Sequence, residues 1–231
     1  MPQALCFDMY GTLCDTRAVE STLADRVDRP RPVVADIAAL WRRKQLEYSY
    51  QVSMMAEAYE SFWELTAHAL DYALDFYGVD TRALDRDAVL AAYETLDAFP
   101  DAEPTLERIV DDPDLDLAVA ILSNGSPDML DTLADNTGLA PYFDVVFSAD
   151  EVRTFKPSPA VYEHAADRLD RSIETCWLVS SNAWDVAGAT AAGMGAAWVN
   201  RDGEPPERVG GEPTVELETL ADLPEALADA A

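Results

Sequence analysis

Positive charge is scarce in this chain. It has 16 Lys and Arg residues against 44 Asp and Glu residues, which gives a formal net charge of −28. Because nucleic acids are bound by basic surfaces, this balance argues against a nucleic-acid partner. The acidic residues are spread over several segments, such as residues 111–116 and 203–207. A dispersed acidic surface predicts adaptation to high salt, as in a protein from a halophile; an ordinary acidic protein of a mesophile is the alternative.

Cysteines and long apolar runs are also lacking. The three cysteines, Cys6, Cys14 and Cys176, do not have the spacing of metal ligands. We expect reduced and mostly buried thiols. No run approaches the roughly 18 apolar residues that span a bilayer, so no membrane partner is expected. The first residues show neither a basic segment nor a long apolar segment, which predicts a cytoplasmic protein without a signal peptide.

Short apolar runs are present, and they alternate with helical patterns. The runs cover residues 3–7, 117–122, 145–147, 176–179 and 196–199, and a last helix is expected from about residue 217. Continuous apolar runs between helices are typical of a parallel sheet that is covered on both faces. The predicted fold class is therefore α/β with a Rossmann-like core. A helical stretch without a convincing strand interrupts it, which predicts a core domain of residues 1–15 and 99–231 and an inserted helical cap domain of residues 16–98.

Polar side chains gather just after the first, second and fourth of these runs. In open α/β sheets this edge is where ligands bind. Asp8 ends the first run, and Thr12 follows it. Ser123 and Asn124 end the second run, where a polar turn is the alternative reading. Lys156 precedes a helix, and residues 180–185 follow the fourth run, where Asn182 could simply cap a helix.

The segment Asp8-Met9-Tyr10-Gly11-Thr12-Leu13 resembles the first motif of the haloacid dehalogenase superfamily. The resemblance implies that Asp8 is a nucleophile that forms a covalent ester, held by backbone amides and the Thr12 hydroxyl. Phosphatases of the superfamily carry an Asp where this chain has Tyr10, and their last motif is acidic where this chain has Ser181 and Asn182. Too few carboxylates remain for a Mg²⁺ site, so neither a metal nor a cofactor is expected.

Two further segments resemble one subgroup, the L-2-haloacid dehalogenases. They are residues 41–48, Trp-Arg-Arg-Lys-Gln-Leu-Glu-Tyr, and residues 179–185, Val-Ser-Ser-Asn-Ala-Trp-Asp. The resemblance implies hydrolysis of small L-2-haloalkanoic acids with water to D-2-hydroxyacids, with inversion, through an aspartyl ester. It also implies a homodimer, since these enzymes are usually dimers.

The same resemblance assigns roles around Asp8. Arg42 faces the substrate and the departing halide, since its cationic donors suit an anion. Ser123 and Asn124 offer donors to the substrate carboxylate. Lys156 keeps Asp8 ionised through its positive charge.

A second group of residues supports these. The residues expected to orient Lys156 and the hydrolytic water are Ser180, Asn182 and Asp185, with Asp185 polarising the water. Tyr162 supports this network and is placed with the substrate-binding residues. The residues expected to form an apolar wall around the alkyl chain and halogen, for which ordinary core packing is the alternative, are Tyr10, Leu46, Phe62 and Trp184.

Two other functions remain open on the sequence. One is a phosphatase of the same superfamily, against which Tyr10 and the last motif argue. The other is a catalytically silent domain that binds small acids, against which the complete set of polar residues argues.

Overall fold

A six-stranded parallel sheet forms the centre of the computed structural model, which describes residues 1–113 and 115–229. The strand order is β3-β2-β1-β4-β5-β6, and every neighbouring pair is parallel. The strands are β1 (Ala4–Phe7), β2 (Ala118–Ser123), β3 (Val145–Ser148), β4 (Cys176–Ser180), β5 (Gly195–Val199) and β6 (Val215–Leu217). Because β1 lies between β2 and β4, the residues that follow these three strands meet at the middle of one sheet edge.

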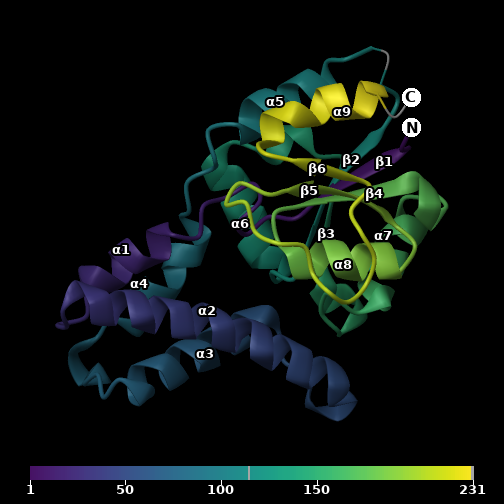
Figure 1. The fold of residues 1–231 in the computed structure, drawn as a ribbon. Helices are drawn as coiled ribbons and strands as arrows, with labels where there is room; N and C mark the ends of the chain where they lie inside the picture. The colour runs from purple at the N-terminus through teal and green to yellow at the C-terminus, as the bar shows by residue number, and fades with distance from the viewer. Residues whose placement is uncertain (114, 230–231) are drawn as a thin grey trace.

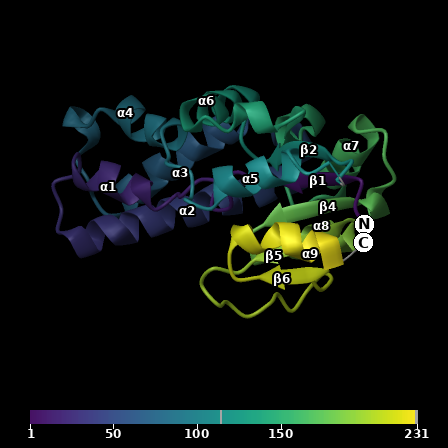
Figure 2. The ribbon, with the colours of Figure 1, turned by 90° about the horizontal axis from the view of Figure 1, so that it is seen from above.

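Helices cover both faces of the sheet, as the continuous apolar runs predicted (Figure 1). One face carries α5 (Ala102–Val110) and α9 (Leu223–Asp229). The other face carries α6 (Pro127–Thr137), α7 (Pro159–Arg168) and α8 (Ala183–Ala191), and Figure 2 shows α5 and α9 in front of the sheet when the molecule is seen from above. Every residue of β1 and β4 is buried, which explains why these strands lack polar alternation.

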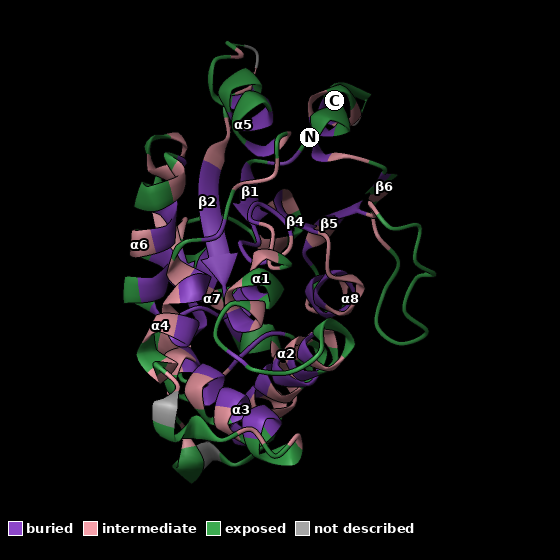
Figure 3. Ribbon diagram, turned by 90° about the vertical axis from the view of Figure 1, so that its left-hand side faces the viewer, coloured by how far each residue is buried: buried purple, intermediate pink, exposed green. Residues whose placement is uncertain are grey.

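Four α-helices lie between β1 and α5 in the chain. They are α1 (Ala18–Ala24), α2 (Arg31–Met54), α3 (Phe62–Phe76) and α4 (Arg86–Leu90). The longest pair, α2 and α3, pack side by side, and Figure 3 shows them beyond the tip of the β2 arrow. They therefore face the sheet edge at which the strands end.

The chain passes to these helices and back at adjacent points. The Asp15 amide donates to the Asp97 carbonyl at 2.9 Å, and the Phe99 amide donates to the Leu13 carbonyl at 2.8 Å. The boundaries predicted from the sequence fall at this crossing. The division into two domains stays a prediction.

The sequence prediction of the last helix was wrong. The helix expected from about residue 217 begins only at Leu223, because residues 215–217 form β6 and pair with β5. The short helix α4 is followed directly by a 3₁₀ turn. The 3₁₀ turns are Ala56–Ala58, Thr81–Ala83, Ala91–Glu94, Ala140–Tyr142, Ala149–Val152, Ile173–Thr175 and Leu220–Asp222.

Candidate active site

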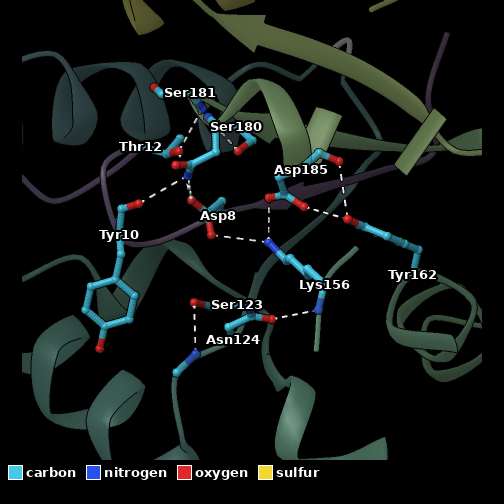
Figure 4. A network of polar contacts seen from close by, with 12 residues as sticks. Asp8, Tyr10, Thr12, Ser123, Asn124, Lys156, Tyr162, Ser180, Ser181 and Asp185 are labelled. Carbon is cyan, nitrogen blue, oxygen red and sulfur yellow. Dashed lines mark hydrogen bonds and ion pairs between the residues drawn. The ribbon is translucent and has the colours of Figure 1, made fainter. Parts of the chain in front are cut away.

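Asp8 directly follows the central strand β1 and is almost fully buried. Its oxygen Oδ2 accepts hydrogen bonds from Thr12 Oγ1 at 3.1 Å and from Asn182 Nδ2 at 2.8 Å. Its oxygen Oδ1 lies 3.2 Å from Lys156 Nζ (Figure 4). Gly11 has a φ of +89°, which strains any residue with a side chain, and this turn brings Thr12 back to the carboxylate. One oxygen of Asp8 is therefore held by two neutral donors, and the other faces only a cation.

Lys156 lies between two carboxylates and has no exposed surface. Its ammonium group contacts Asp8 and, at 2.8 Å, Oδ2 of Asp185. Burial by itself lowers the pKa of Lys156, but the negative charges of Asp185 and Asp8 outweigh it and raise that pKa. Lys156 thus stays protonated and supplies the positive charge that the sequence analysis expected beside Asp8.

Asp185 belongs to the first turn of α8 and is completely buried. Burial raises the pKa of its carboxyl group, the charge of Asp8 adds to this, and Lys156 opposes it. The Tyr162 hydroxyl donates to Asp185 Oδ1 at 2.7 Å. The side chain of Tyr162 has no exposed surface and is not among the residues that line the pocket around Asp8, and its placement among the substrate-binding residues stays a prediction. It positions Asp185.

The last motif divides its contacts among several partners. Ser180, Asn182 and Asp185 were expected to orient Lys156 and the hydrolytic water, and of the three it is Asp185 that contacts the ammonium group. The Ser180 hydroxyl accepts from the backbone amide of Asn182 at 3.1 Å and so shapes the turn. The side chain of Asn182 points to Asp8 instead of Lys156. The Ser181 amide donates to Thr12 Oγ1 at 2.8 Å, which ties the last motif to the first.

Two polar atoms at the pocket have no hydrogen-bond partner among the described residues: Asn124 Nδ2 and the Tyr10 hydroxyl. The other amide atom of Asn124, Oδ1, accepts from the Lys156 backbone amide at 2.8 Å, and this fixes Nδ2 as a donor toward the pocket. The Ser123 hydroxyl lies beside it and accepts from Gly125 N at 3.3 Å. An unpaired buried donor is costly. These residues therefore offer an unfilled place for an anionic oxygen.

One small pocket brings the core residues together with the inserted helices. Arg42 and Leu46 come from α2, Phe62 begins α3, and Trp184 lies in α8. The residues that line this pocket are Asp8, Tyr10, Arg42, Leu46, Phe62, Ser123, Asn124, Asn182 and Trp184. It contains every residue predicted for the wall and for the substrate carboxylate. Asp8 from the core and Arg42 from α2 thus line the same pocket.

The donor set does not fit a magnesium ion. No group of three or more His, Cys, Asp or Glu side chains in residues 1–113 and 115–229 is placed to hold a metal. The two buried carboxylates of Asp8 and Asp185 share the Lys156 ammonium group. Mg²⁺ demands near-octahedral oxygen ligands.

Arg201 holds the site in place and was not predicted from the sequence. The Arg201 guanidinium donates to the Ser181 hydroxyl at 2.7 Å and to the Thr12 carbonyl at 3.1 Å. It also pairs with Asp101 and lies 4.1 Å from the centre of the Phe99 ring. Arg201 follows β5 in a polar loop, and nothing in its local sequence marks it. Only the fold shows that it joins the loop after β1 to the point where the chain returns from the inserted helices.

The sequence of this chain matches a model of a known protein family. The model, described as haloacid dehalogenase-like hydrolase, matches residues 2–193. The chain belongs to this family. Within the haloacid dehalogenase-like hydrolases, it is 39% identical over 205 residues to (S)-2-haloacid dehalogenase 4A of Burkholderia cepacia, covering 89% of this chain and 86% of that protein. It is 38% identical over 226 residues to (S)-2-haloacid dehalogenase 1 of Pseudomonas sp. (strain CBS-3), covering 97% of this chain and 96% of that protein.

A solved structure shares the fold of this haloacid dehalogenase-like hydrolase over the whole chain. It is an L-2-haloacid dehalogenase from Xanthobacter autotrophicus with chloropropionic acid covalently bound. The TM-score is 0.90, the identity is 33%, and 100% of both chains is covered. The predicted α/β fold is therefore confirmed.

Proposed function

We propose that this protein hydrolyses L-2-haloacids to D-2-hydroxyacids, with inversion and through an ester of Asp8. The observation that carries the proposal is the pocket itself, which brings together the buried Asp8 carboxylate, Arg42 and a free donor of Asn124. A carboxylate substrate fits this pair of donors, and the leaving halide fits a cationic guanidinium. The membership in the dehalogenase family supports the same reaction.

In the first step, Asp8 Oδ1 attacks the substrate carbon from the side opposite the halogen. The carbon–halogen bond breaks, and the halide leaves with the bonding electrons toward Arg42. Oδ1 is the attacking oxygen because Oδ2 is already held by Thr12 and Asn182. Lys156 keeps the attacking carboxylate ionised. Inversion follows from the backside attack.

In the second step, water attacks the ester carbonyl carbon of Asp8 and gives its proton to Asp185. The raised pKa of Asp185 makes this carboxylate a stronger base than an exposed one. The hydrogen bonds from Thr12 and Asn182 to Oδ2 stabilise the negative charge that develops on the carbonyl oxygen. The ester then breaks at its acyl–oxygen bond, and the protonated Asp185 returns its proton to the departing alkoxide oxygen. The hydroxyl oxygen of the product therefore comes from Asp8.

Release of halide from separate enantiomers tests the proposed function. Incubation with L-2-chloropropionate should release chloride and form D-lactate, and D-2-chloropropionate should stay intact. Excess enzyme in ¹⁸O water should give unlabelled lactate in a single turnover and place one ¹⁸O atom in Asp8, measured by mass spectrometry of peptides. No chloride release over hours, or label in the first product, contradicts the proposal.

A phosphatase activity lacks its general acid in this pocket. Burial raises the pKa of Tyr10 above its ordinary value of 10, so its hydroxyl is a far weaker acid than a carboxyl group in that position. Hydrolysis of p-nitrophenyl phosphate that depends on Mg²⁺ would revive this alternative.

We further propose that residues 16–98 act as a cap domain and that two copies of the chain form a cytoplasmic homodimer. Arg42, Leu46 and Phe62 of the inserted helices complete the pocket, which supports the cap. The exposed aromatic side chains of Tyr72 and Phe76 stack on each other on α3 and support a contact between copies. No helix among the described residues is long and apolar enough to cross a membrane.

Replacement of Phe76 by glutamate tests the dimer. The F76E variant should sediment as a monomer at concentrations where the wild type is dimeric, because a charge would be buried at the contact. Glu57→Gln on an exposed turn serves as a control. An unchanged dimer in F76E, or a wild-type monomer, contradicts the proposal.

We also propose that the protein is adapted to high salt. A net charge of −28 destabilises the compact state through self-repulsion, and molar salt screens this within about 3 Å. The thermal unfolding midpoint is expected to rise by on the order of 10 °C between dilute buffer and 2 M KCl, which corresponds to about 3 kcal/mol for a chain of this size. Calorimetry at both salt concentrations measures it, and equal midpoints contradict the adaptation.

A further inference from the structure

We propose that Gln45 is a positioning residue for halide departure, because it fixes Arg42 through a buried chain of hydrogen bonds that ends at Phe62. The inference rests on the proposed function, in which Arg42 receives the halide. Gln45 does not line the pocket and touches no reacting atom. Its effect on the reaction passes through Arg42.

The chain of hydrogen bonds joins α2 to α3. Arg42 Nη1 donates to Gln45 Oε1, and Gln45 Nε2 donates to Thr66 Oγ1 at 2.7 Å. The Thr66 hydroxyl then donates to the Phe62 carbonyl at 2.7 Å. Both ends of the chain belong to residues that line the pocket, Arg42 and Phe62. The side chains of Gln45 and Thr66 between them have no exposed surface.

The direction of these bonds is fixed throughout. Arg42 can only donate, so Gln45 must turn its oxygen to it and its amide nitrogen to Thr66. Thr66 accepts that bond and has its own proton left for the Phe62 carbonyl. A flipped Gln45 amide would set two donors against each other at Arg42. Because each hydrogen bond strengthens the next, this series of hydrogen bonds holds Arg42 more firmly than an isolated contact would.

A neutral partner is what the proposed reaction requires. None of the described ion pairs within 4.0 Å involves Arg42, although acidic residues outnumber basic ones in the chain. A carboxylate at position 45 would hold the guanidinium equally well but would cancel its charge. Gln45 fixes the guanidinium by one of its five N–H donors and leaves its positive charge for the halide.

A buried polar bridge between two helices is also costly, because an apolar side chain would pack there without loss of hydration. Gln45 lies in the packed interface of α2 and α3, where Leu40 and Leu70 are buried. A role in packing alone would therefore be served better by an apolar residue. This contrast makes the apolar variant the informative one.

The test compares chloride with bromide as leaving groups in the variant Gln45→Met. Methionine has a similar volume but cannot hold Arg42. The single-turnover rate of halide release from L-2-chloropropionate should fall about 10-fold or more, the worth of one charge-assisted hydrogen bond. The rate from L-2-bromopropionate should fall less, because bromide leaves with less assistance. The ratio of the bromide rate to the chloride rate should thus rise about threefold or more.

Three further variants isolate the cause. Thr66→Val removes the hydroxyl that links Gln45 to the Phe62 carbonyl, and it should also raise the ratio of the bromide rate to the chloride rate. Gln51→Met, on an exposed turn of α2, should leave it unchanged. In an Arg42→Lys background, Gln45→Met should raise the ratio no further, because the residue through which it acts is already altered.

The ratio of two rates on one preparation does not depend on the fraction of folded enzyme. If Gln45→Met fails to fold, Thr66→Val decides. A wild-type ratio in Gln45→Met, or an equal rise of the ratio in the Arg42→Lys background, overturns the positioning role. Absence of halide release from the wild type rejects the proposed function instead.

Discussion

Replacement of Asp8 by asparagine is expected to lower halide release by at least about 10⁴-fold, a loss of the size seen when a covalent nucleophile is removed. The amide has the same shape, but its oxygen is a poor nucleophile and it carries no negative charge. The Thr12 and Asn182 donors keep an acceptor oxygen, so the local structure should persist. Chloride release from L-2-chloropropionate measures the loss.

Two measurements separate this result from misfolding. The thermal unfolding midpoint of Asp8→Asn should stay near that of the wild type, since Lys156 keeps its contact with Asp185. Substrate should still bind in calorimetry through the donors of Asn124 and Arg42. Asp36→Asn, at an exposed position of α2, should retain full activity. Chloride release by Asp8→Asn within 10-fold of the wild-type rate would reject the nucleophile assignment.

Replacement of Lys156 by methionine is expected to remove both activity and much of the stability. It leaves the Asp8 and Asp185 carboxylates buried without a cation, and loss of one partner from a buried ion pair costs about 3–5 kcal/mol. The urea midpoint of unfolding should therefore fall by a large fraction of its wild-type value. The control is Lys44→Met: Lys44 is the other lysine of the chain, lies over the Tyr72 ring at the surface, and should matter little. Equal midpoints for Lys156→Met and the wild type would contradict the electrostatic role.

The same ion cluster predicts the alkaline limit of stability. The pKa of Lys156 is raised in the folded protein above its ordinary value of 10.5. Its contribution is therefore fully present below pH 10.5 and is lost as the pH rises through the folded pKa. Lys156→Met should show no such loss in this range, which urea titrations at a series of pH values would reveal.

The positions of the candidate site residues along the chain were predictable because strand ends converge in a parallel sheet. Asp8, Asn124 and Asp185 follow three adjacent strands, and each run of apolar residues marks where its strand ends. The directions of individual hydroxyl groups were not predictable. Ser180 and Tyr162 were expected at Lys156 or the substrate, but the turn after β4 directs Ser180 to a backbone amide and α7 places Tyr162 behind Asp185.

The residues that hold Arg42 were missed for a related reason. Gln45 and Thr66 lie on two different helices, and nothing in the local sequence of either marks it. The packing of α2 against α3 makes them neighbours. The strand β6 was missed because three residues around Glu216 carry no clear period. These residues form a strand because they pair with β5, a contact that the local sequence pattern does not indicate.

The central place of β1 has a consequence for synthesis of the chain on the ribosome. Among the strands, β1, which ends just before Asp8, emerges first, and its neighbours β2 and β4 emerge only with residues 118–123 and 176–180. Until then both edges of β1 are unpaired, and such edges invite aggregation of nascent chains. The helices α1 to α4 emerge between β1 and β2. The hydrogen bond from the Asp15 amide to the Asp97 carbonyl joins the two ends of the inserted segment. Once it has formed, fewer residues separate β1 from β2, so the loop that closes when these strands pair is shorter.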